Sequence, residues 1–392
     1  MTICFITVCD LKPTAGGVER VCVNIITELL VQHHNVISCY LDKNDVGIIE
    51  GVDSYRFPND KVVNSAENIE MLSNVVKQHS VDIIWNHSHY IDLHKICVEA
   101  KGDAKLVYTY HSDPCSALKE KRDDLALLAT RNSIAGKLQL LRAMIQYPIG
   151  YYLRRKYISR KFRYLYDQSD TLAILSDRFI NSFNRLTGFD DLSKLVAINN
   201  PIYSLSIPEV DIAAKNKQIV FVGRLIWGQK RLDRLLKVWA LLQNRLPDWN
   251  VVVLGDGPHR ELYVNMACKL NLRNIEFKGT QPSEPYYAES SVLCMTSTYE
   301  GFGMVLVEAQ QYGCVPMAFD SFEAVHDIIE DGVNGVIVSP FNTKEYANKL
   351  YDLCQDKTRR EQMAIAGIES VKRFDSKIIV GEWLELFEEL IK

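Results

Sequence analysis

The 392-residue sequence lacks the marks of a secreted or membrane-spanning protein. Its amino terminus, MTICFITVCD, has neither the basic region nor the long apolar stretch of a signal peptide. No segment offers the ~20 uninterrupted apolar residues of a transmembrane helix. The ten cysteines include no C-x-x-C pair, so we expect reduced core thiols in a cytoplasmic protein.

Short motifs that hold metals and common cofactors are also missing. The sequence has no D-x-D triplet and no cluster of His, Cys, Asp and Glu of the kind that binds Mg²⁺ or Zn²⁺. His87 and His89 lie two residues apart, but no further ligands accompany them. GDGP at 255–258 is not G-x-G-x-x-G, and no G-x-x-x-x-G-K-[ST] loop occurs, which disfavours dinucleotide oxidoreductases and NTPases. We expect no metal ion and no cofactor.

Charge of one sign is not in large excess. The net charge of -4 gives no global signature of nucleic-acid binding. The exception is local, because YYLRRKYISRKFRYLY at 151–166 has six basic residues, no acid and interleaved aromatics. This segment indicates either an amphipathic face resting on anionic lipid or a solvated helix whose tyrosines and Phe162 pack on the domain. Nucleic acid is a weaker third partner, because no recognisable binding motif accompanies the segment.

The length of the chain suits two domains, and apolar runs occur in two series. The first series is TICFITV, NVISCYL, VDIIWNH and AKLVYTYH. The second is QIVFVGR, NVVVLGDG, NIEFKG, SVLCMTS, VPMAFD and GVIVS. Buried strands that alternate with helices indicate parallel sheets covered on both faces. We therefore predict an α/β protein of GT-B architecture, with two Rossmann-like doubly wound domains facing a central cleft.

The segment 197–218 has two prolines and little periodicity, which indicates a linker. We place an N-terminal domain at 1–200, the linker at 201–217, a second domain at 218–375 and a C-terminal amphipathic helix at 376–392. In facing domains of this kind, a ligand binds in the crevice at the carboxyl ends of the strands.

Two carboxylates flank a glycine-broken turn in STYEGFGMVLVEAQQYGC at 297–314. Glu300 follows a predicted strand, and the helix that begins after Gly303 carries Glu308. Free amides at the helix start suit an anionic ligand, and a carboxylate such as Glu308 suits the vicinal hydroxyls of a ribose. Taken singly, Glu300 could instead cap the turn, and Glu308 could pair with a nearby cation.

Two cations favour the ligand interpretation. Arg224 ends the first strand of the second domain, and Lys230 opens the following helix. We expect both to reach the crevice, where two cations beside a helix amino terminus can balance a diphosphate without a metal ion.

These motifs, in this order, resemble the donor-binding domain of the retaining GT-B glycosyltransferases of glycosyltransferase family 4, the group 1 glycosyltransferases. VGRL followed by QKR, then VLGDGP, STYEGFGMVLVEA and DIIEDGVNGVIV carry the match over roughly residues 218–340. In the first half, GGVERV at 16–21 resembles the family's glycine loop, and YTYHSDP at 108–114 resembles the stretch bearing its active-site histidine. The interval from Arg224 to Lys230 is one residue longer than the commonest family form.

The resemblance implies a donor site and a catalytic group. Arg224 and Lys230 would hold the diphosphate of a nucleotide sugar, Glu308 its ribose, and Glu300 hydroxyls of the transferred sugar. His111 would lie near the reacting carbon or the acceptor, with a structural histidine as the alternative. The remaining donor contacts would come from Gly16, Gly17, Gly301, Phe302, Gly303, Met304 and Val305.

We expect an enzyme that transfers a sugar, with retention, from a nucleotide diphosphate sugar to a glycan or lipid-linked acceptor in bacterial surface polysaccharide assembly. A uridine donor is preferred because such donors are commonest in the resembling family. The segment 151–166 would hold the enzyme at the inner face of a membrane. Two rivals are a nucleotide-sugar epimerase or hydrolase of the same fold and a non-catalytic sugar-nucleotide-binding subunit.

Overall fold

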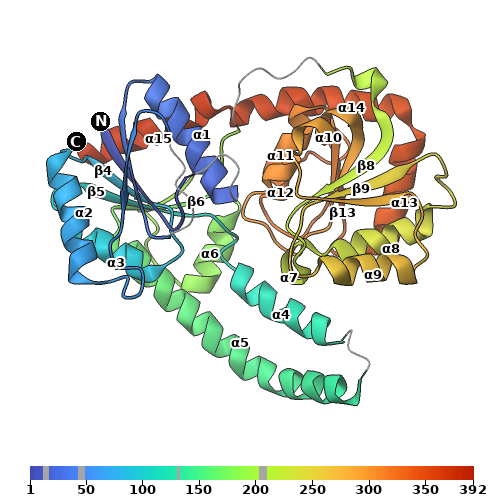
Figure 1. The fold of residues 1–392 in the computed structure, drawn as a ribbon, viewed down its shortest axis with the longest axis horizontal. Helices are drawn as coiled ribbons and strands as arrows, with labels where there is room; N and C mark the ends of the chain where they lie inside the picture. The colour runs from blue at the N-terminus through green and yellow to red at the C-terminus, as the bar shows by residue number, and fades with distance from the viewer. Residues whose placement is uncertain (12–16, 43–48, 130–132, 203–209) are drawn as a thin grey trace. The chain divides into compact units, whose positions relative to one another are not determined.

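A computed structural model describes residues 1–11, 17–42, 49–129, 133–202 and 210–392. The chain divides into two compact units, each with its own parallel sheet (Figure 1). The first unit comprises Met1–Pro114, Arg155–Tyr203 and Phe374–Lys392. The second comprises Cys115–Arg154 and Ser204–Arg373.

The first unit contains a seven-stranded sheet with the order β3-β2-β1-β4-β5-β6-β7, and its described pairings are all parallel. The strands are β1 (Thr2–Thr7), β2 (Asn35–Tyr40), β3 (Val52–Arg56), β4 (Ile83–Asn86), β5 (Lys105–Tyr110), β6 (Thr171–Ile174) and β7 (Leu195–Ala197). The central strands are buried almost throughout, as expected for a sheet covered on both faces.

Six of the helices that the structure describes contribute to the first unit. They are α1 (Gly17–Val31), α2 (Ala66–Gln78), α3 (Ile91–Ala100), the later part of α5 (Ile134–Gln168), α6 (Phe179–Thr187) and α15 (Ser376–Ile391). The predicted C-terminal amphipathic helix is confirmed as α15. Its Trp383 and Phe387 rings pack against Trp85, with centroids 4.3 and 5.0 Å away. These aromatic contacts join the end of the chain to the first sheet.

The second unit contains a six-stranded parallel sheet with the order β10-β9-β8-β11-β12-β13. Its strands are β8 (Asn216–Val222), β9 (Asn250–Leu254), β10 (Ile275–Gly279), β11 (Ser290–Met295), β12 (Val315–Phe319) and β13 (Val336–Val338). The helices are α4 (Ser116–Ala129), the start of α5, α7 (Trp227–Lys230), α8 (Leu232–Leu242), α9 (Arg260–Lys269), α10 (Glu284–Glu289), α11 (Met304–Gln311), α12 (Val325–Ile328), α13 (Thr343–Gln355) and α14 (Lys357–Ser370). Short 3₁₀ turns occur at Ile212–Ala214 and Val371–Phe374.

The predicted α/β fold class is confirmed, because both sheets are parallel and helices lie between most successive strands. Each of the ten quoted strand segments overlaps a strand of the structure. Three strands of the first unit, β3, β6 and β7, were not predicted. β3 lies at the sheet edge, and its VDSYR sequence has only two apolar residues in five positions, with no strict alternation. Among the described residues, no helix combines the length and apolar character needed to cross a bilayer.

The compact units differ from the predicted domains in two places. Residues 115–154, placed in the N-terminal domain from sequence, group with the second sheet, where Lys119 donates from Nζ to the Ser321 carbonyl at 3.1 Å. Phe374 and Asp375 group with the first unit, where Ile202 and Asp375 form a β-bridge. Both differences arise from tertiary contacts between segments far apart in sequence. Residues 203–209 of the predicted linker lie outside the described residues.

Candidate functional site

The candidate site begins at neighbouring strand ends of the second sheet. β8 leads into Arg224, and its neighbour β11 leads into the turn that carries Glu300. Because carboxyl ends of parallel strands meet at the same edge of a sheet, the two loops lie together. The structure therefore brings the VGR and STYEGFG motifs to one edge, as the sequence predicts for a ligand crevice.

Glu300 is buried and lies among three hydrogen-bond donors. Its Oε1 accepts from Lys230 Nζ at 2.7 Å and from the Ser297 hydroxyl at 2.6 Å. Its Oε2 accepts from Gln229 Nε2 at 3.2 Å. Only 6% of Glu300 is exposed, so its charge is balanced by these donors rather than by solvent. The two residues predicted to hold different parts of one ligand, Lys230 and Glu300, thus form an ion pair.

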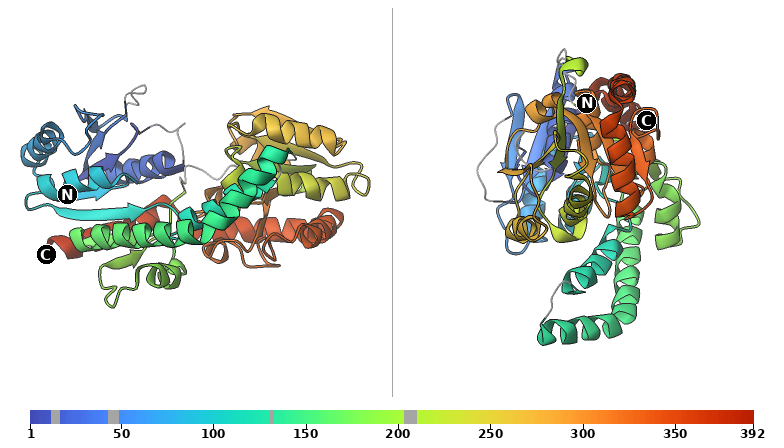
Figure 2. Two further views of the ribbon diagram at one scale, coloured as in Figure 1. Left: turned by 90° about the horizontal axis from the view of Figure 1, so that it is seen from below. Right: turned by 90° about the vertical axis from the view of Figure 1, so that its right-hand side faces the viewer.

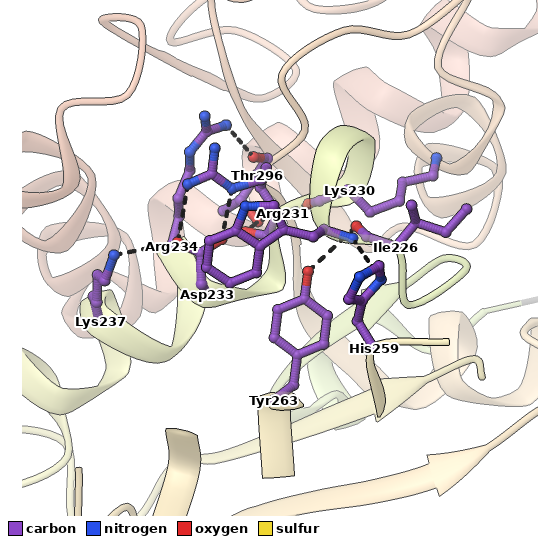
Figure 3. A network of polar contacts seen from close by, with 10 residues as sticks. Ile226, Lys230, Arg231, Asp233, Arg234, Lys237, His259, Tyr263 and Thr296 are labelled. Carbon is purple, nitrogen blue, oxygen red and sulfur yellow. Dashed lines mark hydrogen bonds and ion pairs between the residues drawn. The ribbon is translucent and has the colours of Figure 1, made fainter. Parts of the chain in front are cut away.

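A network of polar contacts fixes the turn that carries Lys230 (Figure 3). Thr296, just past β11, donates from its hydroxyl to the Arg231 carbonyl at 3.0 Å. Arg231 adopts a left-handed backbone conformation with φ of 49°, and its guanidinium bonds both carboxylate oxygens of the fully buried Asp233. Arg234 donates to the Thr296 carbonyl at 2.9 Å. The backbone beside Lys230 is therefore tied to the strand that leads to Glu300.

The other side of this turn is held by α9 and the residue before it. Trp227 donates its backbone N–H to His259 Nδ1 at 3.2 Å, and Tyr263 donates its hydroxyl to the Ile226 carbonyl at 3.3 Å (Figure 3). The Arg231 guanidinium lies 4.8 Å from the centroid of the Trp227 ring. The extra residue between Arg224 and Lys230 is thus accommodated within an anchored turn.

Arg224 differs from Lys230 in its surroundings. Its side chain is exposed, and no partner for the guanidinium occurs among the residues the structure describes. An exposed guanidinium beside a buried ion pair remains available to an anionic ligand.

Glycines bring the first two loops of this sheet into contact. Gly255 has φ of 125°, and a Cβ there would lie 2.1 Å from the Gly223 carbonyl oxygen. Leu225 also donates its backbone N–H to the Asp256 carbonyl at 2.8 Å. The VLGDGP motif therefore supports the backbone on both sides of Arg224.

The helix α11 begins at the glycine turn beside Glu300. Gly303 precedes it with φ of 101°, and a Cβ there would meet Phe322 and Leu306 at 3.2 and 3.3 Å. The first amides of a helix have no intrahelical acceptor, and those of Met304 and Val305 occupy this position. The Phe302 side chain is buried and anchors the turn. The turn from Gly301 to Val305 therefore offers main-chain groups to a ligand and not reactive side chains.

Glu308 lies one turn further along α11 and is half-buried. Its Oε2 accepts a hydrogen bond from the hydroxyl of Tyr287 at 3.0 Å. Tyr287 is fully buried on α10, so its hydroxyl fixes one carboxylate oxygen in place. Sequence reasoning missed this tyrosine, because nothing in EPYYAES marks one of its two tyrosines as the partner of a residue 21 positions later.

His111 lies in the first unit, immediately after β5. Its Nε2 shares a 2.8 Å hydrogen bond with Nδ1 of His87, which immediately follows the neighbouring strand β4. Burial lowers the pKa of His111 to about 4, and burial together with the His111 charge lowers the pKa of His87 well below its usual range. His111 Nδ1 and His87 Nε2 have no partner among the described residues. Both rings are therefore neutral at pH 7.

The glycine loop of the first unit is described only in part. Gly16 lies outside the described residues. Gly17 is the exposed first residue of α1, and a Cβ there would have no atom within 4 Å. Among the described residues, no three His, Cys, Asp or Glu side chains gather as metal ligands would.

Comparison with known proteins identifies the family. Residues 15–203 match the model for Glycosyltransferase Family 4, and residues 205–370 match the model for Glycosyl transferases group 1. The chain belongs to the family 4, group 1 glycosyltransferases. The motifs at Arg224, Lys230, Glu300 and Glu308 lie within the group 1 match, and His111 lies within the family 4 match.

Individual glycosyltransferases resemble the chain to different extents. An amylovoran biosynthesis glycosyltransferase of Erwinia amylovora is 28% identical over 52% of this chain and 58% of its own. The chain spans about half the length of the first curated relatives it matches. Campylobacter jejuni GalNAc-alpha-(1->4)-GalNAc-alpha-(1->3)-diNAcBac-PP-undecaprenol alpha-1,4-N-acetyl-D-galactosaminyltransferase is 24% identical over 96% of both chains. Anabaena HepE, solved with UDP and glucose, has a TM-score of 0.71 at 18% identity and covers 99% of this chain and 100% of its own, which supports the GT-B fold.

A pocket of about 780 Å³, lined in part by Thr298 of the STYEGFG turn, also lies within the second unit of this glycosyltransferase. Tyr147, Pro148 and Tyr151 of α5 line one side, and Thr298 and Phe341 line another. Most of the lining is apolar. A diphosphate is therefore better matched by Arg224, Lys230 and the start of α11 than by this pocket.

Proposed function

We propose that this chain is a retaining glycosyltransferase that moves a sugar from a nucleotide diphosphate sugar to a glycan or lipid-linked acceptor. The observation that carries the proposal is the Lys230–Glu300 ion pair, which lies between the exposed Arg224 loop and the start of α11. This arrangement offers cations, free amides and a carboxylate at one sheet edge. Those groups match the phosphates and hydroxyls of a nucleotide sugar.

Each part of the donor has a candidate partner. Arg224 and Lys230 bind the diphosphate, and the amides at the start of α11 bind phosphate and sugar oxygens. Glu308 binds the two ribose hydroxyls, with its carboxylate oriented by Tyr287. The transferred sugar hydrogen-bonds Glu300.

The chemistry follows from charge development. As the bond between the anomeric carbon and the phosphate breaks, the carbon becomes cationic and the leaving diphosphate gains negative charge. Arg224 and Lys230 stabilise that charge and lower the barrier. Glu300 is already engaged by three donors, which suits it to position the sugar rather than to attack carbon. Retention then follows if the leaving phosphate accepts the proton of an acceptor that attacks from the same face.

His111 contributes from the first unit as a neutral imidazole near the reacting carbon or the acceptor. The hydrogen bond between His111 and His87 restricts rotation of the His111 ring. A neutral ring can polarise or position a hydroxyl without repelling the developing positive charge at the anomeric carbon.

We place the reaction in bacterial polysaccharide or lipid-linked glycan assembly at the inner face of a membrane, with a uridine donor. The Erwinia relative, an amylovoran biosynthesis glycosyltransferase, and the Campylobacter relative, which acts on an undecaprenol-linked glycan, support the setting, and the UDP bound to HepE supports the base. The two cations support a donor site that needs no metal ion and no cofactor.

Product analysis tests the proposal. The purified protein is incubated with UDP-sugars, with and without glycan and polyprenyl-diphosphate-linked acceptors, and the product linkage is read by NMR. We expect transfer only when an acceptor is present, with the anomeric configuration of the donor retained. An isomeric nucleotide sugar formed without acceptor would establish the epimerase alternative. Donor binding without turnover on any acceptor would favour the binding-subunit alternative.

A further inference from the structure

The first half of α5 carries an exposed apolar stripe. Six large residues between Ile134 and Tyr152 recur at intervals of three or four, which places them within about 80° of one another around a helix. Between 54% and 81% of each residue is exposed. The stripe consists of Ile134, Leu138, Leu141, Ile145, Ile149 and Tyr152.

The opposite face of the same helix is the one that contacts protein. Tyr147 and Tyr151 line the apolar pocket of the second unit, and Arg154 pairs with Glu120 of α4 at 3.5 Å. Figure 2 shows the start of α5 standing away from the sheet of its own unit. The stripe is therefore the outward face of an anchored helix, not a core face left open by a missing contact.

Within α5 itself, the charge around the stripe has one sign. No aspartate or glutamate occurs between Ile134 and Asp167, and the exposed Lys137 and Arg142 flank the stripe. Tyrosines also gather at the end of the stripe, as is common where a helix meets a membrane–water interface. Cationic flanks around an apolar face match an anionic lipid surface.

We propose that residues 134–153 of α5 lie in the interface of an anionic membrane, with the stripe inserted among the acyl chains and the cations at the headgroups. A second copy of the chain is a poorer occupant, because pairing two such faces brings Lys137 and Arg142 of both copies together without acidic partners. Only one part of the inference rests on the proposed function, namely that the acceptor is linked to a lipid. Binding to vesicles needs neither donor nor acceptor.

The predicted basic segment 151–166 overlaps this surface only at residues 151–153. Several of its cations make internal contacts: Arg155 donates to the Arg185 carbonyl at 2.9 Å, and Lys161 to the His89 carbonyl at 2.8 Å. Phe162 is buried against Tyr110, as the alternative of a helix packed on its domain predicts. The apolar stripe, of which only Tyr152 lies in this segment, is the better candidate for insertion.

Vesicle sedimentation tests the inference on the full chain. The probes are vesicles of phosphatidylcholine alone and of an equimolar mixture of phosphatidylcholine and phosphatidylglycerol. We expect wild-type protein to bind the mixed vesicles and the triple variant Leu141→Ser, Ile145→Ser, Ile149→Ser to bind them at least tenfold more weakly. Replacing Lys137 and Arg142 by glutamine should reduce the preference for the anionic mixture.

A matched control removes the same kind of side chain elsewhere. Leu241→Ser, Ile365→Ser, Ile378→Ser changes three residues that are also about half or more exposed, and it should bind vesicles as wild type does. Equal binding by the stripe variant and wild type would overturn the inference, as would absence of wild-type binding. A wild-type dimer that the stripe variant converts to a monomer, without vesicle binding, would assign the surface to a second copy. If the stripe variant still binds UDP as wild type does, a loss of vesicle binding does not arise from damage to the donor site.

Discussion

At the scale of single residues, the two carboxylates of the STYEGFGMVLVEA motif have different environments. Glu300 is buried against a lysine, a serine and a glutamine, whereas Glu308 is half-buried and accepts a hydrogen bond from a tyrosine hydroxyl. Neither is surrounded only by apolar side chains, although the sequence places Glu308 in an apolar run. The three donors suit Glu300 to a fixed position, and the side chain of Glu308 is the more exposed of the two.

Glu308→Ala should weaken binding of the donor nucleotide by about 1.5 to 3 kcal/mol, the usual cost of losing hydrogen bonds to a charged group. The carboxylate is only half-buried, so the fold should persist. Isothermal titration with UDP measures the change. Glu276→Ala, on an exposed edge strand, is the matched control. An unchanged dissociation constant for Glu308→Ala would remove the ribose assignment.

Tyr287→Phe tests whether the tyrosine orients that carboxylate. The substitution removes only the hydroxyl, so the expected loss of donor affinity is about 0.5 to 1.5 kcal/mol, smaller than for Glu308→Ala. The double variant should bind no more weakly than Glu308→Ala alone, since the hydroxyl acts through the carboxylate. A loss of affinity in the double variant that equals the sum of the two single losses would show that Tyr287 acts by another route.

Sequence alone predicts which side chains gather at the strand ends but not all of their partners. The motif order places Arg224, Lys230 and Glu300 together because each lies at the carboxyl end of a predicted strand or at the next helix. The Tyr287 contact depends on how α10 packs on α11, which no local pattern encodes. The His87–His111 pair could have been anticipated, because the two residues immediately follow neighbouring strands.

At the scale of elements, the turn from α7 into α8 depends on one buried carboxylate. Asp233 is fully buried, and it accepts from Arg231 and from Lys237 at 3.2 Å. Asp233→Asn removes the balancing charge and should lower the free energy of unfolding by about 3 kcal/mol. Urea unfolding measures this loss. Asp248→Asn, in an exposed pair with Lys217, should change stability by less than about 1 kcal/mol.

Elements with strong periodicity were predicted best. The ten apolar runs and α15 carry enough buried residues to specify strand or helix locally. β3, β6 and β7 are short, and their place depends on pairing with neighbouring strands. The assignment of residues 115–154 to the second unit depends on contacts such as that from Lys119 to Ser321, which sequence proximity cannot supply.

At the scale of the whole molecule, buried histidines should make stability fall with acidity. Burial, with a smaller effect from Lys161, lowers the pKa of His94 to about 4, whereas an unfolded histidine titrates near 6.5. Between those values the unfolded chain binds protons that the folded chain does not. Stability is therefore full above about pH 6.5 and falls as the pH drops toward 4, by about 2 kcal/mol per such histidine at pH 5.

The urea midpoint measured from pH 7 to pH 4.5 tests this dependence. His94→Gln should show a shallower fall than wild type, because one proton-binding group is removed from the unfolded chain. Comparing slopes rather than absolute midpoints separates titration from the packing cost of the substitution. Identical slopes for the two proteins would mean that His94 titrates normally in the folded state.

The central claim is a donor site built on Arg224, Lys230 and Glu308 that holds a nucleoside diphosphate without a metal ion. The most direct test is the melting temperature of the protein with UDP, GDP, ADP and CMP, with and without EDTA. A ligand that binds only the folded state raises this temperature. We predict a rise with UDP that EDTA leaves unchanged and that Glu308→Ala reduces. No rise with any nucleotide, or a rise that EDTA abolishes, would contradict the account.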